Sequence, residues 1–162
     1  MEKTAVFAGT FDPFTMGHYD VALRAASVFD RLIIAVAEDT GGKRAVAGTE
    51  DRLQIVRASV ADIKNVSVES FSGFLTDFVA ASGSRVLVRG LRTYNDFEYE
   101  KSLFEVYRSQ MDVEAVYIMT AGRYSHISGS VVRQLAALGG DLAGFVPESA
   151  RAAVEKIYRK RG

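Results

Sequence analysis

Cysteine is absent from this chain of 162 residues, which excludes a disulfide framework, thiolate chemistry and a cysteine-based zinc site. That absence fits a reducing compartment, and we expect a cytoplasmic protein. An excess of charge is also missing, because 20 lysine and arginine residues balance 20 aspartate and glutamate residues. No overall electrostatic argument therefore favours a nucleic-acid partner, and a site for an anion must be built locally.

Long apolar runs are missing too. No stretch reaches the roughly eighteen apolar residues of a membrane span, so we expect no membrane partner. A basic segment followed by an apolar one is not found at the N-terminus, so no signal peptide is expected. Repeats and linkers are likewise absent. With 48% hydrophobic and 25% charged residues, the composition predicts one globular domain over residues 1–162.

Short apolar runs alternate with helical patterns along the whole chain. Strands are expected at residues 4–8, 31–37, 66–68, 85–88 and 115–119. Helices are expected at residues 19–26, 49–60, 74–81, 96–109, 128–139 and 147–157. Thr49 is the predicted N-cap of its helix, and Phe74 and Leu138 are assigned to apolar helix faces. The alternation predicts an α/β fold with a doubly wound, five-stranded parallel sheet of the Rossmann-like type.

The segment Gly9–His18 links the first strand to the first helix and carries the strongest functional signal. A helix N-terminus presents unpaired N–H groups and the positive end of the dipole, so it favours anions. A histidine there adds a hydrogen-bond donor, or a cation when protonated. The segment is therefore predicted to bind a nucleotide phosphate, with His18 facing the reacting group. The alternative is a tight turn with an ordinary histidine in the cap region.

Basic residues recur where predicted strands end, which is where ligands bind in such sheets. Arg89 and Arg92 flank a glycine turn and are able to hold phosphate oxygens in a bidentate manner. The alternative is a solvated turn with surface arginines. Lys43 lies in a glycine-containing loop after the second strand, where it either clamps a phosphate or faces solvent.

Glu100 shares a helical face with three aromatic residues, Phe97, Phe104 and Tyr107. Buried carboxylates are rare unless they are paired. The partner of Glu100 is therefore an arginine or the ribose hydroxyls of a ligand, unless the side chain reaches water at the edge of the stripe.

Residues 124–130 lead into the next helix. Ser128 or Ser130 is suited to cap that helix, and the same N-terminus is suited to receive a phosphate. His126 has no second histidine or cysteine nearby, so packing or a contact with a base is preferred over metal ligation.

Four motifs together resemble the adenylyl/cytidylyltransferase superfamily and, within it, the bacterial adenylyltransferases of coenzyme A biosynthesis that act on 4′-phosphopantetheine. They are residues 9–18, Arg89-Gly90-Leu91-Arg92, Asp96-Phe97-Glu98-Tyr99-Glu100 and Ile127-Ser128. The resemblance runs nearly end to end. It implies adenylyl transfer from ATP to 4′-phosphopantetheine, with dephospho-coenzyme A and pyrophosphate as products and Mg²⁺ as the cofactor.

The resemblance also implies roles for individual residues. Contacts with the reacting groups are expected from Thr10, His18, Lys43 and Arg92. Binding of the acceptor substrate is expected from Thr10, Lys43, Leu75 and Arg89. ATP binding is expected from Thr10, Phe11, His18, Gly90, Leu91, Arg92, Glu100, Tyr124, Ser125, His126, Ile127, Ser128, Gly129 and Ser130. No residue is expected to ligate a metal directly. A homohexamer and feedback by coenzyme A are further implications.

Four positions depart from the pattern of those relatives. Met16 stands where asparagine is frequent, Tyr124 and His126 stand where tryptophan and phenylalanine are frequent, and Gly129 interrupts a serine run. Two other functions compete with the main one. They are adenylyl or cytidylyl transfer to a different small acceptor, such as nicotinamide mononucleotide or glycerol 3-phosphate, and nucleotide binding without catalysis.

Overall fold

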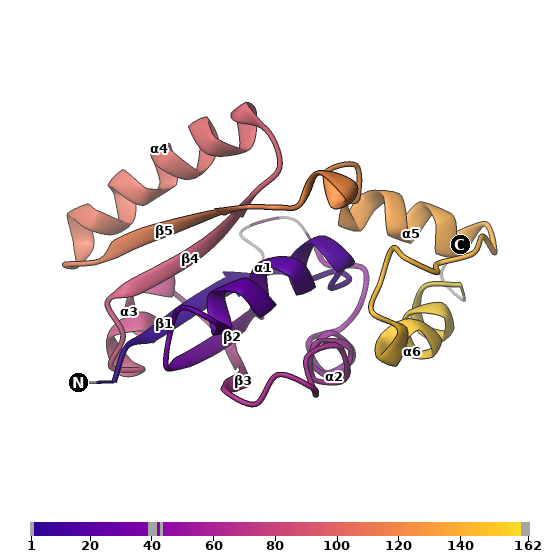
Figure 1. Ribbon diagram of the computed structural model, residues 1–162, viewed down its shortest axis with the longest axis horizontal. Coiled ribbons are helices and arrows are strands. Elements are labelled where there is room, and N and C mark those ends of the chain that lie inside the picture. The colour runs from indigo at the N-terminus through magenta and orange to yellow at the C-terminus, as the bar shows by residue number, and fades with distance from the viewer. Residues whose placement is uncertain (1, 39–41, 43, 160–162) are drawn as a thin grey trace.

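A single five-stranded sheet forms the centre of the molecule, and all of its strands are parallel (Figure 1). The computed structural model describes residues 2–38, 42 and 44–159. The spatial order is β3-β2-β1-β4-β5. The strands are β1 (Thr4–Gly9), β2 (Arg31–Ala37), β3 (Val66–Phe71), β4 (Val86–Leu91) and β5 (Glu114–Met119). This topology confirms the predicted doubly wound α/β fold.

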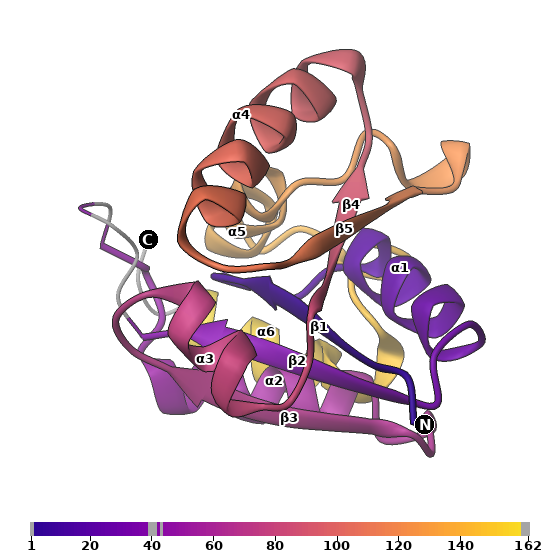
Figure 2. The same cartoon turned by 90° about the vertical axis from the view of Figure 1, so that its left-hand side faces the viewer.

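Helices cover both faces of the sheet. They are α1 (Met16–Ala26), α2 (Thr49–Ser59), α3 (Leu75–Ala81), α4 (Tyr94–Gln110), α5 (Gly129–Ala137) and α6 (Glu148–Arg159), with a short 3₁₀ turn at Gly122–Tyr124. The apolar core beside α1, α2, α5 and α6 is larger than the one beside α3 and α4. Figure 2 shows α3 and α4 on one side of the sheet and α1 on the other.

The central strands are apolar on both sides because helices cover both. Alternate residues of β1 divide between the two cores: Val6 faces α3 and α4, whereas Phe7 faces the α1 side. Ile33 and Ile34 of β2 divide in the same way. Burying each such side chain contributes roughly 1.5–3 kcal/mol. The continuous apolar run predicted for a strand buried on both faces is thereby explained.

Three local predictions are wrong. Thr49 is the first residue of α2 and Gly48 is the N-cap; the Thr49 hydroxyl instead accepts a hydrogen bond from Arg52. Phe74 precedes α3 and is 68% exposed. Leu138 follows α5 and is 80% exposed. In each case the residue lies at a helix end, where a periodic pattern does not determine which way the side chain points.

The sheet has its switch point between β1 and β4. The chain moves outward from β1 to β2 and β3, then crosses back to β4 and β5 on the other side of β1. The loops after β1 and β4 therefore diverge, which leaves space for a ligand beyond their carboxyl ends. Among the described residues, no helix has the length and hydropathy to cross a membrane.

Candidate active site

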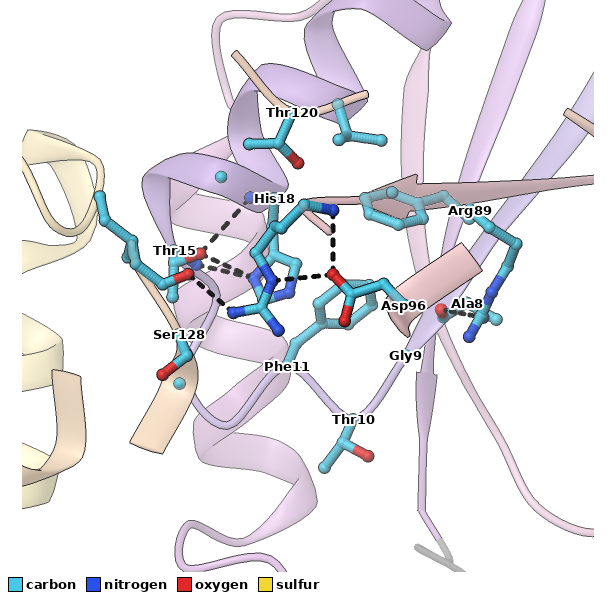
Figure 3. A pocket seen from close by; sticks show the side chains of 17 residues that line it. Ala8, Gly9, Thr10, Phe11, Thr15, His18, Arg89, Asp96, Thr120 and Ser128 are labelled. Carbon is cyan, nitrogen blue, oxygen red and sulfur yellow. Dashed lines mark hydrogen bonds and ion pairs between the residues drawn. The ribbon is translucent and has the colours of Figure 1, made fainter. Parts of the chain in front are cut away.

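A pocket of about 250 Å³ lies at this switch point (Figure 3). Its walls come from the ends of β1 and β4 and from the N-terminal ends of α1 and α5. The lining residues are Phe7, Ala8, Gly9, Thr10, Phe11, Thr15, Gly17, His18, Val21, Arg89, Gly90, Arg92, Asp96, Thr120, Ile127, Ser128 and Gly129. Segments far apart in the sequence thus converge on one cavity.

His18 is fixed in one orientation by a capping box at the start of α1. Thr15 is the N-cap, and its side-chain oxygen accepts from the His18 backbone N–H at 3.4 Å. In return, the Thr15 backbone N–H donates to His18 Nδ1 at 3.0 Å. Because Nδ1 is an acceptor, a neutral imidazole carries its proton on Nε2. The ring therefore offers one N–H donor beyond the capping box.

The surroundings of His18 keep its ring neutral. The rings of Phe11 and Phe14 lie with their centroids 5.1 and 5.3 Å from that of His18. Burial and, to a smaller extent, the positive charges of Arg92 and Arg89 together lower the pKa of His18 from 6.5 to about 4. At neutral pH, His18 is therefore a hydrogen-bond donor rather than a cation.

The turn between β1 and α1 is held in an unusual conformation. Phe11 has a φ of 50°, in the left-handed region that is costly for a side chain of this kind. Its ring packs over Gly9, where a Cβ would lie 2.9 Å from a ring carbon. Gly9 is therefore required by the close approach of Phe11, which explains why a glycine ends the strand.

Asp12 fastens this turn to three other segments. Its carboxylate accepts from the backbone N–H groups of Val46 at 2.8 Å and Ala47 at 3.1 Å, and from the Tyr158 hydroxyl at 2.6 Å. Its carbonyl oxygen accepts from Arg133 of α5 at 2.5 Å. Burial and the bond to Asp12 both raise the pKa of Tyr158. Asp12 thus has a structural role that the sequence pattern did not reveal.

Arg89 points from β4 into a largely buried ion pair with Glu100 of α4. Nε and Nη2 donate to the two carboxylate oxygens at 2.6 and 2.7 Å, and Nη1 donates to the Ala8 carbonyl at 2.9 Å. Burial alone would lower the pKa of Arg89, but the hydrogen bond to Glu100 and the negative charge of Glu100, with smaller contributions from Tyr107 and Tyr117, together outweigh burial and raise the pKa. Of the alternatives for Glu100, the structure shows the arginine partner.

Arg92 lines the pocket just after β4. Its Nη1 donates to the Ile127 carbonyl at 3.2 Å, and its Nε lies 3.4 Å from an Asp96 carboxylate oxygen. The same oxygen accepts from the Arg92 backbone N–H at 2.9 Å. Asp96 also forms a capping box with Thr93 at the start of α4. Asp96 therefore fixes Arg92, a role that the sequence did not predict.

The N-terminus of α5 faces the pocket through Ser128 and Gly129. Ser128 is the N-cap, and its hydroxyl accepts from the Val131 N–H at 3.2 Å, which confirms the predicted cap. A Cβ at Gly129 would lie 3.1 Å from the Asp12 carbonyl oxygen. Glycine at this position therefore lets α5 approach the turn after β1 closely.

The pocket brings together nine of the predicted site residues: Thr10, Phe11, His18, Arg89, Gly90, Arg92, Ile127, Ser128 and Gly129. Seven others do not line it: Leu75, Leu91, Glu100, Tyr124, Ser125, His126 and Ser130. His126 instead contacts the Phe145 ring edge-on at 6.0 Å. Lys43 lies outside the described residues. Three further polar residues that line the pocket, Thr15, Asp96 and Thr120, were not among the predicted site residues. The Thr-x-x-His spacing of a capping box could have indicated Thr15.

Comparisons with known proteins agree with this geometry. Residues 6–135 match the Cytidylyltransferase-like family. In structure, the chain is similar to a protein from Vibrio parahaemolyticus described as a nicotinate-nucleotide adenylyltransferase. The TM-score is 0.67 at 17% identity, covering 95% of this chain and 99% of that one. At this identity the similarity shows the fold alone.

Curated relatives give a narrower assignment. The phosphopantetheine adenylyltransferase of Moorella thermoacetica is 44% identical over 160 residues, covering 98% of this chain and 97% of that protein. The enzyme of the same name from Ralstonia nicotianae is 45% identical over 158 residues, covering 96% and 94%. Fold, pocket and family match together define a nucleotidyltransferase of the cytidylyltransferase-like family. Within it, the chain belongs to the phosphopantetheine adenylyltransferases.

Proposed function

We propose that this protein transfers the adenylyl group of ATP to 4′-phosphopantetheine and releases dephospho-coenzyme A and pyrophosphate. The observation that carries the proposal is the pocket at the switch point. It combines a neutral histidine donor, two arginines and a helix N-terminus, all of which suit phosphate groups.

The reaction needs positioning more than proton transfer. A phosphate oxygen of 4′-phosphopantetheine forms a bond to the α-phosphorus of ATP, and the bond from that phosphorus to the bridging oxygen of pyrophosphate breaks. The second pKa of a phosphate monoester is about 6, so the nucleophile is already largely ionised at neutral pH. No general base is required, and the barrier lies in bringing anions together and stabilising the transferring group.

His18 and Arg92 suit the α-phosphate of the adenylyl group that is transferred. The Nε2–H of His18 donates to a phosphate oxygen without adding a charge that depends on pH. Arg92 adds a positive charge beside the α5 N-terminus, because it donates to the Ile127 carbonyl just before that helix, and the helix itself offers the backbone N–H of Gly129. Thr10 lines the same cavity and contributes its hydroxyl.

Arg89 suits the phosphate of the acceptor substrate. Three of its five N–H groups are used by Glu100 and Ala8, so one N–H on each Nη remains for a ligand. Glu100 orients Arg89 and stays a predicted contact of ATP. Leu75 begins α3, where it packs against the smaller core, and we keep it as a candidate contact for the pantetheine arm. Lys43 stays a predicted contact of the nucleophilic phosphate.

The rest of the predicted ATP segment suits the nucleotide rather than the transferring group. Four of its residues lie in the segment that leads into α5 or in the first turn of that helix: Tyr124, Ser125, His126 and Ser130. Leu91 is buried at the end of β4 and supports the turn that carries Arg92. These residues are proposed to bind ATP beyond the phosphates that occupy the pocket.

Mg²⁺ is the proposed cofactor. The described residues contain no group of three side chains suited to ligate a metal, and the one carboxylate lining the pocket, Asp96, is engaged with Arg92. Magnesium retains waters and binds readily to substrate phosphates, so water and the phosphates of ATP would supply most of its ligands. The ion would neutralise part of the phosphate charge.

A homohexamer and feedback by coenzyme A are proposed on the family resemblance. Helix α4 supports self-association, because its apolar and aromatic residues Tyr94, Tyr99 and Val106 are exposed. Coenzyme A contains the same pantetheine arm as the product, which supports competition for one site. Analytical ultracentrifugation and inhibition by coenzyme A test these two points. A cytoplasmic location and the absence of nucleic-acid or membrane partners stay predictions.

Product analysis tests the proposed function. ATP, Mg²⁺ and 4′-phosphopantetheine are incubated with the protein, and the mixture is separated by chromatography. We expect dephospho-coenzyme A and pyrophosphate in equal amounts. Consumption of ATP without dephospho-coenzyme A would contradict the proposal.

A further inference from the structure

Arg52 is a buried arginine that lies behind the pocket and has no assigned role. It belongs to the first turns of α2, and it is only 1% exposed. Its guanidinium donates to the carbonyl oxygens of Thr10 at 2.7 Å, Ala37 at 2.8 Å and Ala47 at 3.2 Å. A fourth bond reaches the Thr49 hydroxyl at 3.2 Å. Within the described part of the chain, Arg52 forms no ion pair with a carboxylate.

Burial of the Arg52 charge, unpaired within the described residues, needs a physical explanation. Burying a guanidinium without a counter-ion carries a large desolvation cost, which its hydrogen bonds must offset. Three of the acceptors are backbone carbonyls at the ends of β1 and β2 and just before α2. The planar fork of arginine reaches several acceptors in fixed directions, which a lysine ammonium on a single stem does not reproduce. Arg52 therefore fixes the directions of these peptide groups.

The Thr10 carbonyl matters most, because its peptide group continues into the pocket. In a trans peptide, the carbonyl and the N–H of the next residue point in opposite directions. The only cis peptide among the described residues is Asp12–Pro13, so the Thr10–Phe11 peptide is trans. With the Thr10 oxygen bonded to Arg52, the Phe11 N–H points away from Arg52.

Phe11 lines the pocket and has its φ at 50°. The described residues provide no hydrogen-bond acceptor for its N–H outside the regular elements. A residue with a strained φ angle, whose N–H has no partner among the described residues, is a typical feature of a functional site when it lies beside a phosphate pocket. The bond from Arg52 is the contact that holds its carbonyl in place.

We propose that Arg52 is a positioning residue, which holds the Thr10–Phe11 peptide so that the Phe11 N–H donates to a phosphate oxygen of ATP. This inference rests on the proposed function, because it takes ATP as the ligand of the pocket. Arg52 does not touch the substrates and acts through the peptide group.

Replacing Arg52 with lysine tests the inference, because Arg52→Lys keeps the charge and removes the fork. Arg57→Lys on the same helix is the matched control, since Arg57 is exposed and its ion pair within the described residues is a 3.7 Å surface contact with Glu50. ATP affinity is measured by calorimetry, and kcat and KM are measured well below the melting temperature of each variant. We expect Arg52→Lys to weaken ATP binding and to lower kcat by about 10- to 100-fold, less than the roughly 10²–10³-fold loss on removal of a preorganised donor, because the Phe11 N–H is misdirected and not deleted.

Comparing the two substrates and the two variants distinguishes a positioning role of Arg52 from a purely stabilising one. The KM for 4′-phosphopantetheine should change by less than about threefold in Arg52→Lys, and Arg57→Lys should match the parent protein. A lower melting temperature with unchanged ATP affinity and unchanged kcat would overturn the proposal and leave Arg52 a purely structural residue.

A second measurement needs no variant and no turnover. In protein labelled with ¹⁵N-phenylalanine, addition of ATP and Mg²⁺ without acceptor should move the Phe11 amide proton strongly downfield, because it gains a charge-assisted hydrogen bond. An unmoved Phe11 amide in protein that binds ATP would overturn the inference. If the protein binds ATP but makes no dephospho-coenzyme A, the proposed acceptor is wrong, while this resonance still shows whether the Phe11 N–H donates to ATP, and ATP affinity in Arg52→Lys still tests the role of Arg52.

Discussion

Arg89 of β4 and Glu100 of α4 are joined by two parallel hydrogen bonds of 2.6 and 2.7 Å, with side-chain exposures of 19% and 13%. The pair connects a central strand to the helix that covers it. Because Glu100 holds the guanidinium in one orientation, the two N–H groups of Arg89 that Glu100 and Ala8 do not use point in fixed directions. Glu100 therefore determines how Arg89 meets an anion in the pocket.

Removing one partner of this pair should be costly. Glu100→Leu leaves the Arg89 charge without its partner, and we expect a loss of about 3 kcal/mol in the free energy of unfolding. Urea denaturation measures the change. The matched control is Glu69→Leu, which removes an exposed pair with Arg31 at 3.7 Å and should cost less than about 1 kcal/mol.

The double variant Arg89→Met with Glu100→Leu separates charge from packing. It should recover most of the stability lost by Glu100→Leu, because no unpaired charge remains. A double variant that is as unstable as the single one would show that the ion pair is not the source of the loss.

His18→Ala should act on the chemical step. Loss of the Nε2–H donor is expected to lower kcat by about 10²–10³ with a small change in KM, because the bond strengthens in the transition state. Steady-state kinetics with both substrates measure the split. His18→Gln retains an N–H donor and should recover part of the rate. Near-normal kcat with a raised KM would mean that His18 serves binding instead.

The pH dependence should not report His18 near its ordinary pKa. With a folded pKa of about 4, His18 stays neutral above that pH, so the acidic limb of kcat/KM should follow the substrate phosphate near pH 6. The parent protein and His18→Gln should therefore share this limb. An acidic limb that disappears in His18→Gln would assign it to the histidine.

The lowered pKa of His18 also makes the free energy of unfolding depend on pH. The folded pKa of His18 lies below its unfolded value of 6.5, so its contribution is fully present above pH 6.5. That contribution is lost as the pH falls from 6.5 towards 4, where the unfolded chain takes up the proton first. The free energy of unfolding, measured by urea, should therefore fall more in the parent protein than in His18→Gln over this range.

The main elements of this fold could be predicted because their signals are local. Buried parallel strands appear as apolar runs, and the strand-to-helix turn at residues 9–18 carries glycines and a histidine at fixed spacing. Helix ends were less predictable. Thr49, Phe74 and Leu138 all lie where the apolar period stops, and there tertiary contacts decide the direction of a side chain.

The site was predicted where its residues belong to compact motifs and missed where it depends on long-range contacts. His18 and Arg92 lie in short, recognisable segments. Asp12 receives bonds from Val46, Ala47 and Tyr158, and Arg52 reaches across to Thr10, so neither role follows from sequence spacing. The Arg89–Glu100 pair was one of the possibilities for Glu100, and only packing of α4 on β4 decides it.

Gly129→Ala should disturb the approach of α5 to the turn after β1. The new Cβ would lie 3.1 Å from the Asp12 carbonyl oxygen, so the helix N-terminus must shift. We expect the KM for ATP to rise several-fold while the KM for 4′-phosphopantetheine changes less. Gly122→Ala is the control, because no atom lies within 4 Å of its added Cβ. Equal effects of both variants would contradict this explanation.

Acceptor specificity tests the central claim most directly. Pyrophosphate release from ATP and Mg²⁺ is measured with 4′-phosphopantetheine, nicotinamide mononucleotide or glycerol 3-phosphate as the acceptor, and with none. The account predicts release with 4′-phosphopantetheine alone, accompanied by dephospho-coenzyme A. Release with another acceptor, or none with any acceptor in protein that binds ATP, would contradict it.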